Sequence, residues 1–494
     1  MSKFVKTLSL ILALLMLVST LAACGGSGDE GGNETKKPGE SVAGTAGGEA
    51  ATDKVLPALN WNGTEYRVLG RDYTSDIFKN FEIDRDELPE DVVGAAVWTR
   101  NQNIMDKYGL DVVGTLEKDP TATAKLFLEA GDDNYDLFMC SPEDMHPFAM
   151  QGYLINLYDL EYINMDHDAW NDYANGQLTM GGKLYYTTNK FLLQEKHRTW
   201  AYYYNRELAR ELNVGYLEDE VFDGKWTLDR VIEIAKATSS EYDGEDGITY
   251  YDRWGVSLSD KYCFAQMLFG AGFRLTERGS DGYPKLAGAS DETLSIIDKV
   301  YELTLNQDIC FTTSIRSSAS EVNLKGANIF TEGRAVLMGH CISKIDELTE
   351  KSAFEFGFLP NPKLNEKQEE YSSFPNYGNG SLFAVPASVV DLAKAGFGLE
   401  AISEESVDTT YYAYIETKCK LQDAFDEDAA KCLDIIFEGV VYDIAFTSNI
   451  GGLGSLVKDT LVAQKTNTYA RLYDRISKIA EKEIAKIKET YSAQ

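Results

Sequence analysis

Between residues 66 and 140, short apolar runs alternate with segments of helical periodicity. This alternation constrains the fold of the chain most strongly. Residues 66–70, 110–113 and 135–140 are apolar runs of strand length, and residues 93–108 and 122–130 between them place apolar side chains on one helical face. Strands that alternate with helices pair in parallel through right-handed crossovers. The sequence therefore predicts an α/β fold.

Two polar loops follow strands of this predicted sheet. In open α/β sheets, ligands gather at the carboxyl ends of the strands. The loop at 71–74 follows the first strand and carries Asp72, and the loop at 141–145 follows the third strand and carries Glu143. Both carboxylates can accept hydrogen bonds from hydroxyl groups, so we predict that they contact a ligand.

The rest of the chain is richer in helices. We expect helices at 205–212, after a cap at Thr227, at 290–305 and at 469–491, the last with a buried stripe formed by Leu472, Ile476 and Ile479. The sequence contains no repeat of fixed period and no phosphate loop or nucleophile elbow.

Length and charge restrict the organisation and the partners. With 494 residues, the chain exceeds the size at which one hydrophobic core usually stops growing, so two or more lobes are expected. Hydrophobic residues make up 44%, which is ample for burial. The formal net charge of −32 repels phosphate backbones, which excludes nucleic acid as a partner.

The amino terminus predicts export and lipidation. Residues 1–23 combine two lysines, a short apolar run and small residues, the pattern of a secretory signal peptide. The run ends in Leu-Ala-Ala-Cys, which resembles a bacterial lipobox, so Cys24 is expected to carry the lipid anchor. Residues 24–60 follow as a flexible leash, with nine glycines between Gly25 and Lys54. The alternative is an ordinary signal peptide with an incidental cysteine.

Cysteine and histidine usage argues against a metal site. Six cysteines follow Cys24 without CxxC spacing and with apolar neighbours, so they are expected to be buried core thiols, although an exported protein can form disulfides. The four histidines are isolated from one another and from the cysteines. We expect no metal and no cofactor.

Five phrases of the sequence, in this order, resemble the family 1 extracellular solute-binding proteins, the sugar-type receptors of ABC importers. They are GGKLYY at 181–186, YYNREL at 203–208, WTLD at 226–229, FTEGRAVLMG at 330–339 and FGFLPNPK at 356–363. The chain departs from the family pattern in its greater length and in Thr187-Thr188-Asn189, where the family usually has Gly-Leu-Pro.

The resemblance implies a two-lobe periplasmic-binding-protein-like fold of type II, with the lobes joined by crossover hinge segments. Lobe 1 is expected to comprise 61–165 and 341–392, and lobe 2 to comprise 166–340 and 393–494 with the C-terminal helices. The solute would lie in the cleft between them, closed by a hinge motion.

A sugar site needs aromatic faces for C–H patches, and carboxylates and amides for hydroxyl groups. Besides Asp72 and Glu143, we expect ligand contacts from Tyr251 and Trp254, which flank a turn before a strand, and more weakly from Trp170. By analogy with the family, His340 after the AVLMG run and Tyr377 and Asn379 in the loop 376–380 are further predicted contacts. For each of these residues the alternative is ordinary core packing or a plain loop.

The resemblance implies a binding protein that catalyses no reaction. The expected protein is a monomeric lipoprotein outside the cytoplasmic membrane, on a Gram-positive cell surface or in a periplasm, that hands a solute to an ABC permease. A mono- or oligosaccharide is expected first, then a polyol, then a peptide. The alternatives are an exported carbohydrate-active enzyme and a sensory or adhesion lipoprotein with the same fold.

Overall fold

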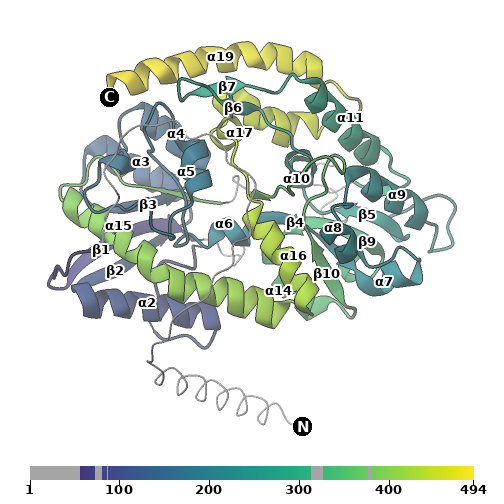
Figure 1. Ribbon diagram of the computed structural model, residues 1–494, viewed down its shortest axis with the longest axis horizontal. Helices are drawn as coiled ribbons and strands as arrows, with labels where there is room; N and C mark the ends of the chain where they lie inside the picture. Colours follow the sequence, from purple (N-terminus) through teal and green to yellow (C-terminus); the bar gives the residue numbers. More distant parts are fainter. Residues whose placement is uncertain (1–55, 73–79, 86, 313–325, 376–379) are drawn as a thin grey trace, which may run out of the picture. The chain divides into compact units, whose positions relative to one another are not determined.

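Strand β1 (Thr64–Arg71) lies inside the first sheet of the computed structural model (Figure 1), which describes residues 56–72, 80–85, 87–312, 326–375 and 380–494. β1 pairs in parallel with β2 (Leu110–Glu117) and with β3 (Leu137–Cys140). β12 (Leu382–Ala384) adds to β3 in antiparallel orientation, giving the order β12-β3-β1-β2. The parallel pairing predicted for the first three strands is confirmed.

The helices between these strands begin and end where the sequence provides caps. Helix α2 (Val92–Tyr108) begins after Asp91, whose carboxylate accepts a hydrogen bond from the Gly94 amide. It ends at Gly109, which has a φ of 60°, a left-handed conformation that glycine adopts without strain. Helix α3 (Pro120–Ala130) ends at a glycine in the same conformation. Both helices agree with the prediction.

The second sheet has the order β10-β4-β9-β5-β8. Its strands are β4 (Thr199–Asn205), β5 (Trp254–Leu258), β8 (Cys310–Phe311), β9 (Ala335–Cys341) and β10 (Phe356–Leu359), and β11 (Phe374–Pro375) also pairs with β4. β5 lies parallel to β8 and β9, whereas β4 runs antiparallel to β9 and β10. Parallel β5 and β9 therefore end at the edge of the sheet where β4 begins.

Two segments belong to the sheet of the other lobe, and not to the lobe that the sequence predicts for them. Residues 356–375 were expected with the first lobe, but β10 and β11 hydrogen-bond to β4 in the second sheet. Helix α15 (Leu392–Ser406) was expected with the second lobe, but it packs on the first sheet: the Tyr66 hydroxyl donates to the Ala395 carbonyl at 3.2 Å, and Lys394 Nζ lies 3.0 Å from Asp136. These differences arise because non-local strand pairing, which sequence order does not reveal, assigns each segment.

The remaining elements cover the sheets and connect them. They are α4 (Pro142–Met150), η1 (Leu157–Asp159), α5 (Asp172–Leu178), α6 (Gln194–His197), α7 (Arg206–Glu211), α8 (Leu217–Phe222), α9 (Leu228–Thr238), α10 (Tyr262–Gly270), β6 (Thr276–Arg278), β7 (Pro284–Leu286), α11 (Asp291–Leu305), α13 (Gly326–Thr331), η3 (Ile342–Lys344), α14 (Ile345–Lys351), η4 (Val407–Tyr411), η5 (Ala413–Asp423), α16 (Glu427–Glu438), α17 (Ile444–Thr447), η6 (Ile450–Gly452), α18 (Leu453–Ser455), η7 (Leu456–Leu461) and α19 (Tyr469–Ala493).

Helix α19 contacts elements from both halves of the chain (Figure 1). Near its start, the Tyr469 hydroxyl donates to the Gly288 carbonyl at 2.6 Å, and at its end the Gln494 side chain donates to the Ala149 carbonyl in α4 at 3.1 Å. The helix was predicted, but its buried stripe differs from the expectation because Ile479 is 54% exposed. The buried positions are Tyr469, Tyr473, Ala480, Ile484, Ile487 and Tyr491.

The packing of α15 against β1 predicts a stability effect at Gly398. A Cβ atom there would lie 2.2 Å from Cδ2 of Tyr66, whose side chain is fully buried. We expect Gly398→Ala to lower the free energy of unfolding by about 1–3 kcal/mol, because overpacking forces a buried ring to move. Urea denaturation measures the change. The matched control is Gly176→Ala in α5, where no atom lies within 4 Å and alanine should stabilise the helix by about 0.5–1 kcal/mol. Equal effects at the two positions would contradict this packing.

A buried carboxyl group near the same sheet predicts a pH effect on stability. Burial raises the pKa of Glu82 from 4.5 to about 7. Because the folded pKa is the higher one, stability should fall as pH rises from about 4.5 to about 7. Glu82→Gln removes this titration. The free energy of unfolding of the variant, relative to that of the wild type, should therefore rise by about 2–3 kcal/mol from pH 4.5 to pH 8. Urea denaturation at both pH values measures the difference, and a difference independent of pH would contradict the burial of an ionisable Glu82.

The six cysteines from Cys140 onward are all buried and form no disulfide bond with one another. They are therefore buried free thiols, as the flanking residues predict. Among the described residues, no helix has both the length and the apolar character needed to cross a membrane.

Candidate functional site

The carboxyl ends of strands from both sheets carry polar and aromatic side chains. Asp72 follows β1, and Glu143 lies in the first turn of α4 directly after β3. In the second sheet, Asp260 follows β5, and His340 is the last residue but one of β9. Trp200 near the start of β4 pairs with Cys341, the last residue of β9, so it lies at the same edge. Both sheets thus present functional groups where a ligand of an α/β fold is expected.

Electrostatic contacts indicate that these two edges face each other. Lys261, beside Tyr262 at the second edge, forms an ion pair with Asp459 in η7 at 2.5 Å. Burial raises the pKa of the Tyr262 hydroxyl, and the negative charges of Asp260, Glu143 and Asp459 raise it further. Glu143 also forms an ion pair with Lys458 in η7. Residues that are distant in sequence therefore meet around Tyr262.

Two buried guanidinium groups, those of Arg71 and Arg198, also lie at these edges of the sheets. Arg71 ends β1, Arg198 immediately precedes β4, and both side chains are buried. Burial lowers the pKa of Arg198, and the positive charge of Arg71 contributes to this shift. The Arg198 guanidinium donates to Ser343 Oγ at 3.3 Å. The edge therefore contains cations as well as carboxylates, and both can bond the hydroxyl groups of a solute.

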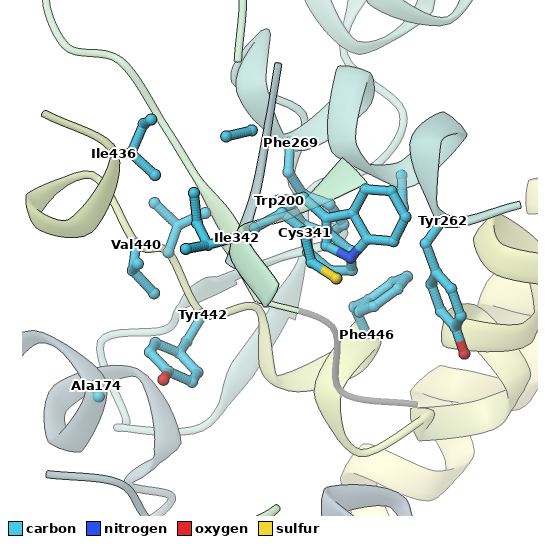
Figure 2. Packing of buried hydrophobic residues seen from close by; sticks show 14 of the residues in the cluster. Ala174, Trp200, Tyr262, Phe269, Cys341, Ile342, Ile436, Val440, Tyr442 and Phe446 are labelled. Atoms are coloured by element: carbon cyan, nitrogen blue, oxygen red, sulfur yellow. The ribbon is translucent and has the colours of Figure 1, made fainter. Parts of the chain in front are cut away.

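Three rings form the aromatic part of the site. Trp200 stacks on His340 with ring centroids 5.4 Å apart and an interplanar angle of 19°, and it lies 6.3 Å from Tyr262. Figure 2 shows Trp200, Tyr262 and Cys341 packed together. Trp200 is 1% exposed, and its indole nitrogen has no hydrogen-bond partner among the described residues. A buried indole N–H without an acceptor is costly, and a solute oxygen would remove that cost.

Asp72, Glu143 and His340 lie at this edge, as their positions in the sequence predict. The backbone amide of Asp72 continues the sheet by donating to the Glu117 carbonyl at 2.7 Å. Asp72 itself is exposed. Glu143 and His340 are partly buried. Whether these side chains bind a ligand stays a prediction.

Trp170 lies elsewhere, in the packing of the first sheet. It is 5% exposed, and its indole nitrogen donates to Glu400 Oε2 in α15 at 3.0 Å. Its ring meets Phe383 of β12 edge-on, with centroids 6.0 Å apart. Both the polar atom and the ring are engaged in core contacts, so we leave Trp170 out of the candidate site.

Tyr251 and Trp254 lie at the opposite end of β5. Trp254 begins β5 and pairs with Ala335, the first residue of β9, whereas Leu258 at the other end pairs with Gly339. Tyr251 is 62% exposed, and the Trp254 ring packs on Phe311 with centroids 5.4 Å apart. The structure does not bring this pair to the edge that holds Glu143 and His340, because a parallel strand begins at the edge remote from its carboxyl end.

Three predicted residues fall outside the described part of the chain. Tyr377 and Asn379 lie within 376–379, and the lipidation residue Cys24 lies within 1–55. Their predicted roles therefore rest on the sequence.

Asp260, Tyr262 and Trp200 were missed by the sequence analysis. A signal for the first two was present: they follow the predicted strand that begins near Trp254, and the rule that ligands gather at carboxyl ends points after that strand instead of before it. Trp200 offered no such signal, because β4 is antiparallel and only its pairing with β9 places its first residues at this edge.

Metal ligands do not cluster among the described residues of this edge. Across the described ranges, no three side chains of His, Cys, Asp or Glu lie where they could hold one ion. The groups present are suited to hydrogen bonding and ring stacking.

The sequence matches no family model and no curated protein. Its structure is similar to a cyclo/maltodextrin-binding protein complexed with maltotetraose, with a TM-score of 0.56 at 16% identity, covering 85% of this chain and 97% of that one. An ABC transporter solute-binding protein from Thermotoga lettingae, bound with α-D-tagatose, gives 0.53 at 14% identity, covering 85% and 100%. An ABC substrate-binding protein from Listeria monocytogenes, in complex with cycloalternan, gives 0.52 at 13% identity, covering 87% and 99%.

These similarities extend over nearly the whole length of each solved structure, at sequence identities that carry information on the fold alone. They agree with the two sheets of mixed parallel and antiparallel strands, and with the helices that cover them. The chain therefore has the two-lobe, type II periplasmic-binding-protein-like fold of these substrate-binding proteins.

Proposed function

We propose that the protein is a family 1 solute-binding lipoprotein that captures a carbohydrate between the facing edges of its two sheets and delivers it to an ABC permease. The observation that carries this proposal is the meeting of the rings of Trp200, Tyr262 and His340 with two carboxylates: Asp260 lies two residues before Tyr262, and Glu143 is brought to the same place by its ion pair with Lys458 of η7, whose neighbour Asp459 pairs with Lys261. Rings cover the C–H faces of a sugar, and carboxylates accept hydrogen bonds from its hydroxyl groups.

The fold supports a binding role without chemistry. The solved structures named above are binding proteins, and the ligands in them are maltotetraose, α-D-tagatose and cycloalternan, all of them sugars. For this chain we propose ligand contacts from Asp72, Glu143 and His340, together with Asp260, Tyr262 and Trp200. Tyr377 and Asn379 remain proposed contacts from the sequence.

The proposed location rests on the amino terminus. A signal peptide at 1–23, a lipid on Cys24 and a leash over 24–60 would hold the protein outside the cytoplasmic membrane, where a transported solute is first met. The proposed partners are therefore the solute, the membrane-spanning subunits of an ABC permease, and the membrane through the lipid alone. We propose that the protein acts as a monomer.

A thermal-shift screen tests the proposal. The protein, cut after the leash, is mixed with mono- and oligosaccharides, polyols, amino acids, peptides and divalent metals. A solute at 100 times its Kd should stabilise the folded state by about 2.7 kcal/mol and so raise Tm. We expect the shift with one sugar class, and a smaller shift for Asp72→Ala and Glu143→Gln. The control is Glu277→Gln, an exposed carboxylate in β6 that should leave the shift unchanged.

The same samples separate the alternative functions. Sugar recovered intact supports capture, whereas hydrolysed sugar would replace the proposal with a carbohydrate-active enzyme. A shift produced only by amino acids or peptides would refute the carbohydrate assignment and keep the binding role. Co-purification of the full-length protein with permease subunits distinguishes delivery to a transporter from a sensory or adhesive role.

A further inference from the structure

The thiol of Cys341 lies among polar and cationic groups at the carboxyl end of β9. Its sulfur is 3.0 Å from Ser343 Oγ, 3.4 Å from His340 Nδ1 and 3.6 Å from an Arg198 guanidinium nitrogen. A nearby guanidinium and hydrogen-bond donors stabilise a thiolate over a thiol. This environment differs from that of a cysteine packed among apolar side chains.

The other cysteines provide the comparison. Burial raises the pKa of Cys140, Cys263 and Cys419 to about 12, and it raises that of Cys432 as well. Burial alone would also raise the pKa of Cys341, but the charge and hydrogen bond of His340, together with Arg198 and Ser343, lower it to about 6. These neighbours therefore favour the ionised form of Cys341 at neutral pH.

A second observation at this place is a buried hydrogen-bond donor that lacks an acceptor. Trp200 lies directly opposite Cys341 in the β4–β9 pairing, and directly opposite residues of an antiparallel pair share one face of the sheet. Figure 2 shows the two side chains together. The indole N–H of Trp200 is buried without a partner among the described residues, so an oxygen atom bound to the Cys341 sulfur would give it an acceptor.

We propose that Cys341 is an oxidation site at which a hydroperoxide forms a sulfenic acid held by Trp200 and Arg198. The thiolate sulfur attacks the terminal oxygen of the hydroperoxide, an S–O bond forms and the O–O bond breaks. Sulfur is oxidised by two electrons, the peroxide is reduced by two, and the leaving alkoxide or hydroxide takes a proton from water.

The consequence for binding rests on the proposed function. Cys341 is beside Trp200 and His340, which we place in the solute site, so an oxygen on its sulfur occupies space and hydrogen bonds that a solute would use. Cys341 is 2% exposed, so the hydroperoxide enters when the two edges separate. Oxidation therefore switches solute capture off, and bound solute protects the thiol.

Several titratable groups surround the thiol and influence how its ionisation depends on pH. His340 precedes it on β9, Arg198 approaches from the segment before β4, and Arg71 lies near Arg198. The Tyr203 hydroxyl of β4 donates to the Cys341 carbonyl at 3.1 Å. Ionisation of Cys341 is thus governed chiefly by the imidazole and the guanidinium groups.

The first test measures which cysteine is oxidised. The full-length protein is exposed to hydrogen peroxide between pH 5 and pH 8 with dimedone, which traps sulfenic acids, and every cysteine peptide is quantified by mass spectrometry. We expect labelling at Cys341 roughly tenfold faster than at Cys140, Cys263, Cys419 or Cys432, rising from pH 5 to pH 7. Labelling of Cys341 no faster than these four, or none at all, overturns the proposal.

The second test concerns the groups that hold the product. Trp200→Phe removes the indole N–H and should shorten the lifetime of the Cys341 sulfenic acid several-fold. The matched control is Trp254→Phe, whose indole nitrogen is also buried without a partner among the described residues but lies at the other end of β5. An equal lifetime in the two variants overturns the role of Trp200. Alkylation rates of unoxidised Cys341 show whether either variant merely changed access.

The third test links oxidation to solute binding. Once the thermal-shift screen identifies a solute, its shift is compared before and after peroxide treatment, for the wild type and for Cys341→Ser, each against its own untreated sample. We expect loss in the wild type only. Equal loss in both overturns the switch. If no solute binds either form, the proposed function fails while selective dimedone labelling of Cys341 still stands.

Discussion

Replacing Tyr262 with alanine is expected to weaken solute binding by roughly 30-fold, which corresponds to about 2 kcal/mol. The ring lies 6.3 Å from Trp200 and close to Glu143 and Asp260, so its loss removes one wall of the proposed sugar site. Isothermal titration of the sugar identified by the thermal-shift screen measures the change. The free energy of unfolding without solute should be recorded in parallel, because Tyr262 is 6% exposed and its truncation also affects packing.

Tyr251→Ala is the matched control for this variant. Tyr251 precedes β5 and Tyr262 follows it, so the two tyrosines lie at opposite ends of one strand. The geometry predicts lost affinity at Tyr262 alone, whereas the sequence-based expectation for Tyr251 predicts a loss there too. A Tyr251→Ala effect as large as that of Tyr262→Ala would move the site to the other end of the strand.

Replacing Arg206 with alanine is expected to lower the free energy of unfolding by about 3–5 kcal/mol. Its guanidinium donates to Glu218 Oε1 from Nε at 3.0 Å and to Asp426 Oδ1 at 3.1 Å, and it joins the end of β4 to α8 and α16. Glu218 is fully buried and burial raises the pKa of its carboxyl group to about 8, so above that pH the variant leaves an uncompensated carboxylate inside the protein. Urea denaturation at pH 9, where Glu218 is ionised, measures the loss.

A double variant identifies the cause of that loss. Adding Glu218→Gln to Arg206→Ala removes the stranded charge and keeps an acceptor for the Tyr204 hydroxyl, which bonds Glu218 in the wild type. The double variant should recover about half or more of the lost free energy, because the cost of a broken buried pair is mainly that of the unpaired charge. No recovery would mean that Arg206 acts through packing instead.

Much of the first sheet was predictable because its signals are local. Apolar runs of strand length, a cap at Asp91 and a glycine at 109 each act within a few residues, and β1, α2, β2, α3 and β3 follow them. The positions of Asp72 and Glu143 follow from the same logic, since a residue after a parallel strand lies at the carboxyl-end edge wherever that strand sits in the sheet.

The second sheet and the placement of Trp200 in the candidate site depended on contacts between distant segments. β10 and β11 pair with β4 across more than 150 residues of sequence, and no local pattern records that choice. Trp200 lies at the site only because β4 runs antiparallel to β9, and Trp170 is engaged in core contacts only because α15 brings Glu400 to its indole. Short-range propensities thus decided which residues form strands and helices. Strand direction and order, set by long-range burial and hydrogen bonding, decided which of their side chains meet.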